Sequence, residues 1–123
     1  MQIVTKEDDA MKVSELVKEL NLVVFSGGEG LGHEITGGYV SDLLSDVMGN
    51  SSEGEVWVTL QTHRNVVAIA SLKELACILL VSSLVPEQNT IDHSNEEGIP
   101  VLGTSLSTFE IAGLLYQKIN NAR

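Results

Sequence analysis

The apolar residues of this chain fall into short unbroken runs separated by polar or helix-like segments. Residues 55–61 (EVWVTLQ) are rich in strand-forming side chains, residues 77–81 (CILLV) are wholly apolar, and residues 99–102 (IPVL) form a third run. Helices are expected between them, at 66–75 and 90–97. Unbroken apolar runs are typical of parallel strands that are covered on both faces. The pattern therefore predicts an α/β fold with a mostly parallel β-sheet, right-handed crossovers and flanking helices.

The rest of the chain completes this picture. Apolar residues at helical spacing predict a helix that contains Val13, Leu16, Val17 and Leu20 and ends at Asn21. Strands are expected at 22–25 and 35–40. A helix capped by Ser41, with Asp42 in its first turn, should bury Leu43, Leu44, Val47 and Met48. The last helix should begin at Ser107 with Glu110 as its capping-box partner. Its buried stripe should be Ile111, Ala112, Leu115, Tyr116 and Ile119, and the sheet region should bury Leu60, Ile69, Leu79, Leu80 and Val101.

Length and charge bound the class of protein. The 123 residues are expected to form one domain over 11–123, preceded by an N-terminal extension at 1–10 that is either flexible or adds a short strand at 2–5. A net charge of −10 argues against nucleic acid or an anionic membrane as the main partner. The single cysteine, Cys77, lies in an apolar run and is expected to be an inert buried residue. With no run of about 20 apolar residues, the chain is expected to be soluble and cytoplasmic.

Motifs for catalysis or cofactor binding are weak. The loop at 26–32 (SGGEGLG) follows a strand, as a dinucleotide-binding turn does, but no helix is expected to open at its last glycine, so a flexible surface connection is favoured. There is no phosphate-binding P-loop and no nucleophile elbow. The histidines, His33, His63 and His93, lack metal-ligand spacing. The sequence therefore predicts no cofactor, no metal site and no catalytic residues.

Small and polar residues gather after the three predicted parallel strands. Because ligands of parallel sheets bind beyond the carboxyl ends of the strands, these residues are candidates for a binding site. They are Thr62, His63, Arg64, Asn65, Ser82, Ser83, Thr104 and Ser105, with Ser107 nearby. Arg64 is the expected cation for a phosphate or carboxylate and should face the edge of a pocket. The alternative is that the hydroxyl residues only cap helices.

Several of these segments together resemble the bacterial DRTGG-domain family. The similarity rests on the helix start at 12–13, the segment 35–44 (ITGGYVSDLL), the segment 59–68, and 98–102 (GIPVL) before 107–109 (STF). It covers residues 11–119. The same fold resembles the N-terminal domain of HPr kinase/phosphorylase and a domain of some phosphotransacetylases. At the family's Asp-Arg this chain has His63-Arg64. The family's Thr-Gly-Gly falls on SSL at 82–84 or one residue earlier, on VSS at 81–83, so the glycine turn is expected to be lost.

The resemblance implies a regulatory and dimerising module without catalytic activity. In one group of inorganic pyrophosphatases such domains lie between nucleotide-sensing CBS modules. Our first hypothesis is therefore a non-catalytic homodimer that senses a small anionic metabolite, a nucleotide or a phosphorylated compound, and acts on a protein partner in signalling or redox metabolism. Residues 37–40 and 84–86 are the expected interface pieces. The alternatives are a small enzyme acting on a phosphorylated substrate, with His63 as its acid or base, and a structural adaptor without a small-molecule site.

Overall fold

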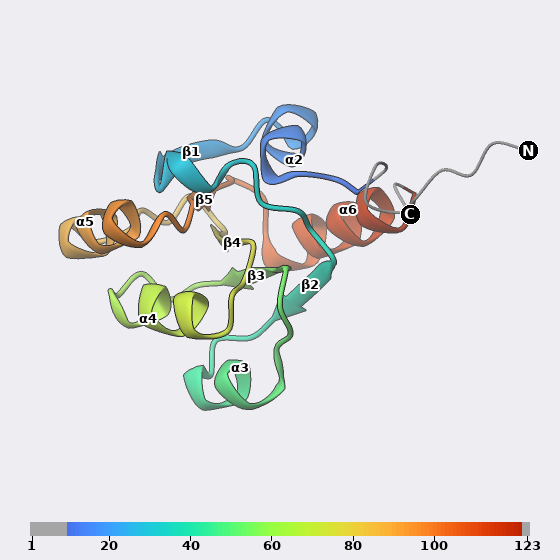
Figure 1. Cartoon of the computed structure of the whole chain (residues 1–123). Coiled ribbons are helices and arrows are strands. Elements are labelled where there is room, and N and C mark those ends of the chain that lie inside the picture. Colours follow the sequence, from blue (N-terminus) through green and yellow to red (C-terminus); the bar gives the residue numbers. More distant parts are fainter. Residues whose placement is uncertain (1–9, 122–123) are drawn as a thin grey trace, which may run out of the picture.

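The computed structural model of the protein describes residues 10–121. Its five strands form one sheet in the order β1-β5-β4-β3-β2 (Figure 1). The strands are β1 (Val23–Ser26), β2 (Gly37–Val40), β3 (Glu55–Thr59), β4 (Cys77–Leu80) and β5 (Val101–Gly103). Neighbours from β2 to β5 are parallel, and β1 pairs with β5 in the antiparallel direction. The predicted mostly parallel α/β sheet is confirmed.

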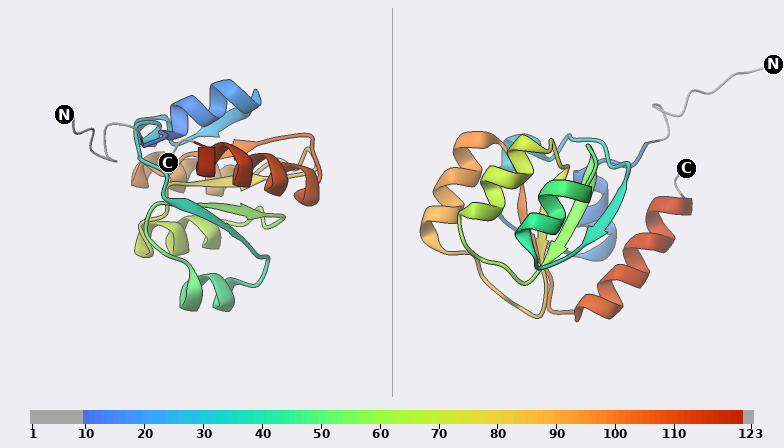
Figure 2. Two further views of the ribbon diagram at one scale, coloured as in Figure 1. Left: turned by 90° about the vertical axis from the view of Figure 1, so that its right-hand side faces the viewer. Right: turned by 90° about the horizontal axis from the view of Figure 1, so that it is seen from below.

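Helices cover both faces of this sheet. They are α2 (Val13–Leu20), α3 (Leu44–Asn50), α4 (Asn65–Leu72), α5 (Gln88–Glu97) and α6 (Thr108–Asn121), with a short 3-10 helix, η1 (Gly28–Gly30). Figure 2 shows α2 and α6 on one side of the sheet and α3 and α4 on the other. Helix α5 packs beside α4 and against β1. None of the helices within residues 10–121 has the length and apolar character needed to cross a membrane.

Alternation along the strands divides the core into two clusters. In β3, Val56 and Val58 belong to the cluster under α2 and α6, whereas Trp57 belongs to the cluster under α3 and α4. Side chains of a strand point alternately to opposite faces, so a strand covered on both faces must be apolar at every position. This is why β3 and β4 appear in the sequence as unbroken apolar runs.

Helix α5 has few apolar residues and is held largely by hydrogen bonds. Its buried Ser94 hydroxyl donates to the carbonyl of Ile99 at 2.6 Å and accepts from the Ser26 hydroxyl at 2.8 Å. The side-chain oxygen of Asn95 accepts a hydrogen bond from the backbone N–H of Gly27 at 2.8 Å. The glycine-rich loop is therefore tied to α5; Gly27 and Gly30 are buried, while Gly28, Glu29 and Gly32 are at the surface.

Four apolar residues expected in the core are exposed. Helix α3 begins at Leu44, two residues later than a cap at Ser41 predicts; Leu43 and Met48 are exposed, while Val47 is buried. Leu60 lies one residue beyond the end of β3, where the sheet no longer covers it. Tyr116 is exposed because α6 packs on a narrower stripe made of Ile111, Leu115 and Ile119.

Other predicted details agree with the structure. Helix α2 buries Val13 and Leu16 and ends at Asn21, whose backbone is left-handed. The capping box of α6 is present: the backbone N–H of Ser107 donates to the Glu110 carboxylate at 3.1 Å, and the Glu110 N–H donates to the Ser107 hydroxyl at 3.2 Å. The expected N-terminal extension lies outside the described residues, apart from Ala10.

Candidate functional site

The loops that carry the predicted site residues all follow the carboxyl ends of β3, β4 and β5. Because these strands are parallel, their loops lie on one edge of the sheet, which we call the carboxyl edge. The middle strand of the sheet is β4. The site residues divide into two groups around it. Thr62, His63, Arg64 and Asn65 lie between β3 and α4, and Ser82, Ser83, Thr104 and Ser105 lie around the ends of β4 and β5.

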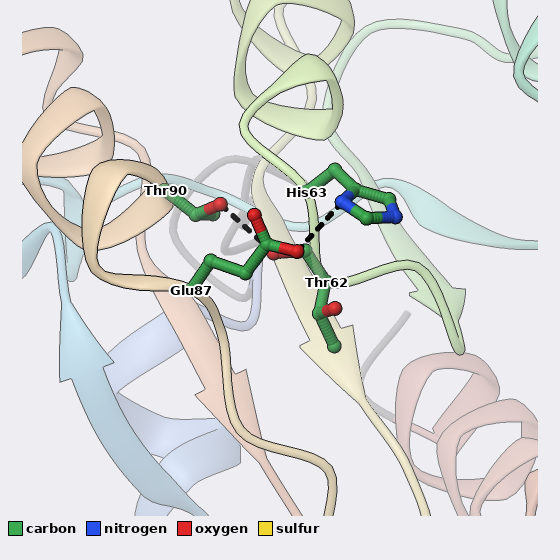
Figure 3. Close-up of polar contacts among 4 residues, drawn as sticks. All are labelled: Thr62, His63, Glu87 and Thr90. Carbon is green, nitrogen blue, oxygen red and sulfur yellow. Dashed lines mark hydrogen bonds and ion pairs between the residues drawn. The ribbon is translucent and has the colours of Figure 1, made fainter.

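The first group joins the start of α4 to the start of α5. The Nδ1 atom of His63 lies 2.7 Å from Oε2 of Glu87. The carbonyl of Thr62 accepts hydrogen bonds from the Thr90 hydroxyl at 2.8 Å and from the Glu87 backbone N–H at 3.2 Å (Figure 3). Glu87 therefore holds the His63 ring by one nitrogen, an orienting partner that sequence reasoning missed because 24 residues separate the pair. The pair remains open to solvent, with the His63 side chain 63% exposed.

Arg64 is exposed at the start of α4. Its backbone is already helical, with φ −58° and ψ −22°, and its side chain is exposed. It lines neither of the two cavities described below. Helix α4 begins one residue after Arg64, and the position of Arg64 at the edge of a ligand pocket stays a prediction.

The second group contains a turn of unusual backbone conformation. Ser82 and Ser83 are both left-handed, with φ of 55° and 61°, and the Leu84 N–H closes the turn on the Val81 carbonyl at 3.1 Å. Left-handed backbone favours glycine, because a side chain costs about 1–2 kcal/mol there. Ser82 and Ser83 thus form a left-handed turn without glycine.

This turn is locked to the loop after β5. The N–H of Ser82 donates to the carbonyl of Leu106 at 2.9 Å, and the N–H of Ser83 donates to the carbonyl of Thr104 at 2.9 Å. The Thr104 hydroxyl in turn accepts from the Leu106 N–H at 3.2 Å. The hydroxyls of Thr104 and Ser107 thus accept hydrogen bonds from nearby backbone N–H groups, as expected if hydroxyl residues here only cap turns and helices. The backbone N–H groups of the serine turn are occupied and unavailable to an anion.

A cavity of about 450 Å³ opens beside this turn, and we call it the carboxyl-edge cavity. Its apolar lining consists of Leu20, Val23, Phe25, Leu84 and Leu106. Its polar lining consists of Asn21, Ser83, Thr104 and Ser105, and Gly103 completes it. Three predicted site residues therefore line one cavity. Sequence reasoning missed the residues from α2 and β1, because only the antiparallel pairing of β1 with β5 brings the start of β1 to this edge.

A second cavity, of about 620 Å³, lies at the opposite edge and is acidic. Glu34, Glu53, Glu74 and Glu97 line it together with His33, whose Nδ1 lies 3.1 Å from the Ala76 carbonyl. No lysine or arginine is among its lining residues, so an anion would be repelled there. Within residues 10–121 no group of three histidine, cysteine or acidic side chains is arranged to hold a metal ion. The larger cavity thus does not suit the predicted ligand.

Cys77 is fully buried in β4, on the face covered by α2 and α6. Burial raises the pKa of its thiol to about 12, since the charged thiolate is disfavoured away from water. The thiol is therefore protonated at neutral pH, as expected for a cysteine that only packs.

The architecture is that of a DRTGG-like α/β domain, as the sequence resemblance implied. A solved structure with this fold contains the CBS and DRTGG domains of the regulatory region of a Clostridium perfringens pyrophosphatase, in complex with its activator, diadenosine tetraphosphate. The TM-score is 0.71 at 14% sequence identity, and the match covers 97% of this chain and 53% of that one. This chain thus spans about half of the matched chain, and the likeness concerns the fold. No protein-family model matches the sequence, and no curated protein matches it.

Proposed function

We propose that this protein is a non-catalytic regulatory module that self-associates and senses a small anionic metabolite, a nucleotide or another phosphorylated compound. The carboxyl-edge cavity carries the proposal. Its volume of about 450 Å³ is in the range of small-molecule sites, and its walls combine apolar side chains with a few polar groups. No aspartate, glutamate, histidine, lysine or cysteine lines it, so none of its lining side chains is suited to act as a general acid or base.

The likeness in fold supports the regulatory part of the proposal. The matched structure belongs to the regulatory region of a pyrophosphatase and holds a nucleotide activator. By analogy, this chain would change the activity of another protein when its own ligand binds, and a partner in signalling or redox metabolism is the expected one. Analogy of fold alone does not define a site, so the ligand must be argued from the residues.

Arg64 is the proposed contact for the negative charge of the ligand. It lies on the same edge of the sheet as the cavity, and within residues 10–121 no carboxylate forms an ion pair with it. A guanidinium in solvent is free to take a phosphate by two parallel hydrogen bonds. The ligand would therefore extend from the cavity across the end of β4 toward the start of α4.

A thermal-shift screen of nucleotides and phosphorylated metabolites, followed by calorimetry, tests the proposal. Arg64→Ala should weaken binding of the best ligand by about 1.5–3 kcal/mol, the range of a charge-assisted hydrogen bond. Lys73→Ala, at the other end of α4, removes the same charge from the chain and should leave the affinity unchanged. Equal affinities of the wild type and Arg64→Ala would remove Arg64 from the site, and a screen without any hit would favour the structural adaptor.

Self-association is proposed through exposed apolar residues at the end of β2. Val40, Leu43 and Leu60 are 50%, 64% and 45% exposed, and we call them the β2-end patch. Asp42 connects them, because its neighbour in sequence is Leu43 and its carboxylate accepts the Leu60 N–H at 2.6 Å. Strand β2 is also a sheet edge with unpaired backbone groups. A second copy of the chain that covers this edge would bury both features.

A small enzyme acting on a phosphorylated substrate is the second candidate, and the His63–Glu87 pair favours it. A carboxylate on Nδ1 leaves Nε2 of His63 free to exchange a proton, as in many acid–base catalysts. Against it, His63 lines neither cavity. Incubation of the protein with each screening hit decides between the two: turnover that His63→Ala abolishes supports the enzyme, and intact ligand supports the regulatory module.

A further inference from the structure

The carboxyl-edge cavity differs from an anion site in one respect: none of the side chains that line it is charged. The chain as a whole carries −10, so a phosphate placed inside would face an unfavourable field without a compensating cation. The Glu87 carboxylate already lies at the start of α4, because it contacts His63, the residue before Arg64. Most of the affinity for a ligand must therefore come from an uncharged part that fits the cavity.

An aromatic ring is part of the cavity wall. Phe25 is the third residue of β1, and its ring packs on Gly103 at the carboxyl end of the neighbouring strand β5. A side chain at position 103 would overlap the Phe25 ring, so glycine lets the ring lie close to the backbone of β5. Flat aromatic surfaces of this kind stack with planar rings.

Hydrogen-bonding groups complete the wall. The side chains of Asn21, Ser83 and Ser105 make no hydrogen bond to any other residue within 10–121, although all three line the cavity. Asn21 offers both a donor and an acceptor, and each hydroxyl can act as either. A ligand with hydrogen-bonding groups on its edge could use them without breaking a bond of the protein.

We propose that the carboxyl-edge cavity binds an uncharged planar ring with a hydrogen-bonding edge, of the kind that a nucleobase presents, against Phe25. This inference rests on the proposed function and names the part of the ligand that its cavity takes. The phosphate of a nucleotide would then lie outside the cavity and contribute less than the ring does. A ligand that is only phosphate, or only an aliphatic chain, should not occupy the site.

The serine turn offers a matched pair of variants for the test. Ser82 and Ser83 have nearly the same left-handed backbone, but only Ser83 lines the cavity. Replacing either by glycine relieves the same backbone strain, so both variants should fold and melt at or above the wild-type temperature. Only Ser83→Gly also removes a hydroxyl from the cavity. A difference between them in binding therefore reports on the cavity and not on stability.

Calorimetry of the full chain with adenosine, guanosine, cytidine and uridine provides the measurement, with inorganic phosphate and a short fatty acid as comparison ligands. We expect at least one nucleoside to bind. Ser83→Gly should weaken it roughly 3- to 10-fold, the loss of one hydrogen bond, while Ser82→Gly leaves it unchanged. Ser105→Trp, which places a large side chain at an exposed lining position, should abolish binding.

The outcomes separate this inference from the proposed function. The ring site is refuted if no nucleoside binds, if only the fatty acid binds, or if the two glycine variants bind alike. A phosphorylated metabolite that requires Arg64 but binds Ser105→Trp as well as wild type would refute the ring site and keep the proposed function. Should Ser105→Trp fail to fold, the two glycine variants alone decide.

Discussion

The carboxylate of Asp42 accepts a hydrogen bond of 2.8 Å from the hydroxyl of Thr59, and so joins the end of β2 to the end of β3. The same oxygen accepts the Leu60 N–H at 2.6 Å. Thr59 is buried, so its hydroxyl, which also accepts the Gln61 N–H at 3.2 Å, depends on Asp42 as the acceptor of its own proton. We expect Asp42→Ala to lower the free energy of unfolding by about 1–3 kcal/mol, the cost of a buried polar group left without its partner. Urea denaturation followed by circular dichroism measures it.

A matched control for this prediction is Asp42→Asn, which keeps an oxygen acceptor at the same place. It should lose less than half as much stability as Asp42→Ala. If both variants lose the same amount, the negative charge and not the hydrogen bond is what stabilises the end of β2.

Gly27 is the second test position, because the glycine-rich loop packs on the segment before β5. Its φ is 73°, and a Cβ atom there would overlap the carbonyl oxygen of Ile99. Gly27→Ala should therefore destabilise the fold by about 2–5 kcal/mol, combining the left-handed backbone with overpacking. Gly28→Ala is the control, since nothing lies within 4 Å of a Cβ at that position. Thermal melts of the two variants that coincide would contradict the packed loop.

Tyr39 and Asp46 form a hydrogen-bonded pair whose titration can be followed. The Tyr39 hydroxyl donates to Asp46 at 2.8 Å. This bond to Asp46 is the largest cause that raises the pKa of Tyr39 above 10.0, with desolvation next. The pKa of Asp46 is lowered from 3.8, chiefly by the hydrogen bond from Ser41 and then by those from Asn50 and Tyr39. Each group is thus held in the protonation state that keeps the bond.

The signs of the two pH effects on stability follow from these shifts. Because the folded pKa of Tyr39 is raised, its contribution is complete below pH 10.0 and is lost as the pH rises through the folded value. Because the folded pKa of Asp46 is lowered, its contribution is present above pH 3.8 and is lost as the pH falls through the folded value. In Tyr116→Phe protein, where Tyr39 is the one tyrosine left of two, tyrosinate absorbance should rise at a pH above 10.0.

Asp46→Asn added to Tyr116→Phe should move this titration back toward 10.0, since the carboxylate is the main cause of the shift. A midpoint that stays where it was would assign the shift to burial of the ring instead.

The β2-end patch predicts how self-association can be broken. Leu43→Lys combined with Leu60→Lys places two charges where apolar side chains would meet a second copy, so the protein should become a monomer of 13.2 kDa. Light scattering with size-exclusion chromatography measures the mass. Leu72→Lys is the control: Leu72 is at least as exposed as Leu43 and Leu60, but it lies at the end of α4, away from the carboxyl edge. A wild-type protein that is already monomeric at micromolar concentration would end the proposal.

Most of the fold could be predicted from the sequence because its signals are local. The apolar runs that became β3, β4 and β5 need both faces covered, and that requirement is visible in each run by itself. The ends of α2 and α6 were also predictable, because Asn21 and the Ser107–Glu110 box act within one turn of the backbone. Order along a parallel sheet then placed Ser83, Thr104 and Ser105 on one edge.

What the sequence did not determine depends on contacts between distant residues. The antiparallel pairing of β1 with β5 added Asn21, Val23 and Phe25 to the cavity, and the contact with Glu87 holds His63 toward α5. No local sequence pattern predicts the β1–β5 pairing or the His63–Glu87 contact, since each joins two segments that are distant in the sequence. Likewise, the left-handed backbone of Ser82 and Ser83 is imposed by their hydrogen bonds to the loop after β5, against the preference of serine itself. Local propensity decided the elements, and packing between them decided the shape of the site.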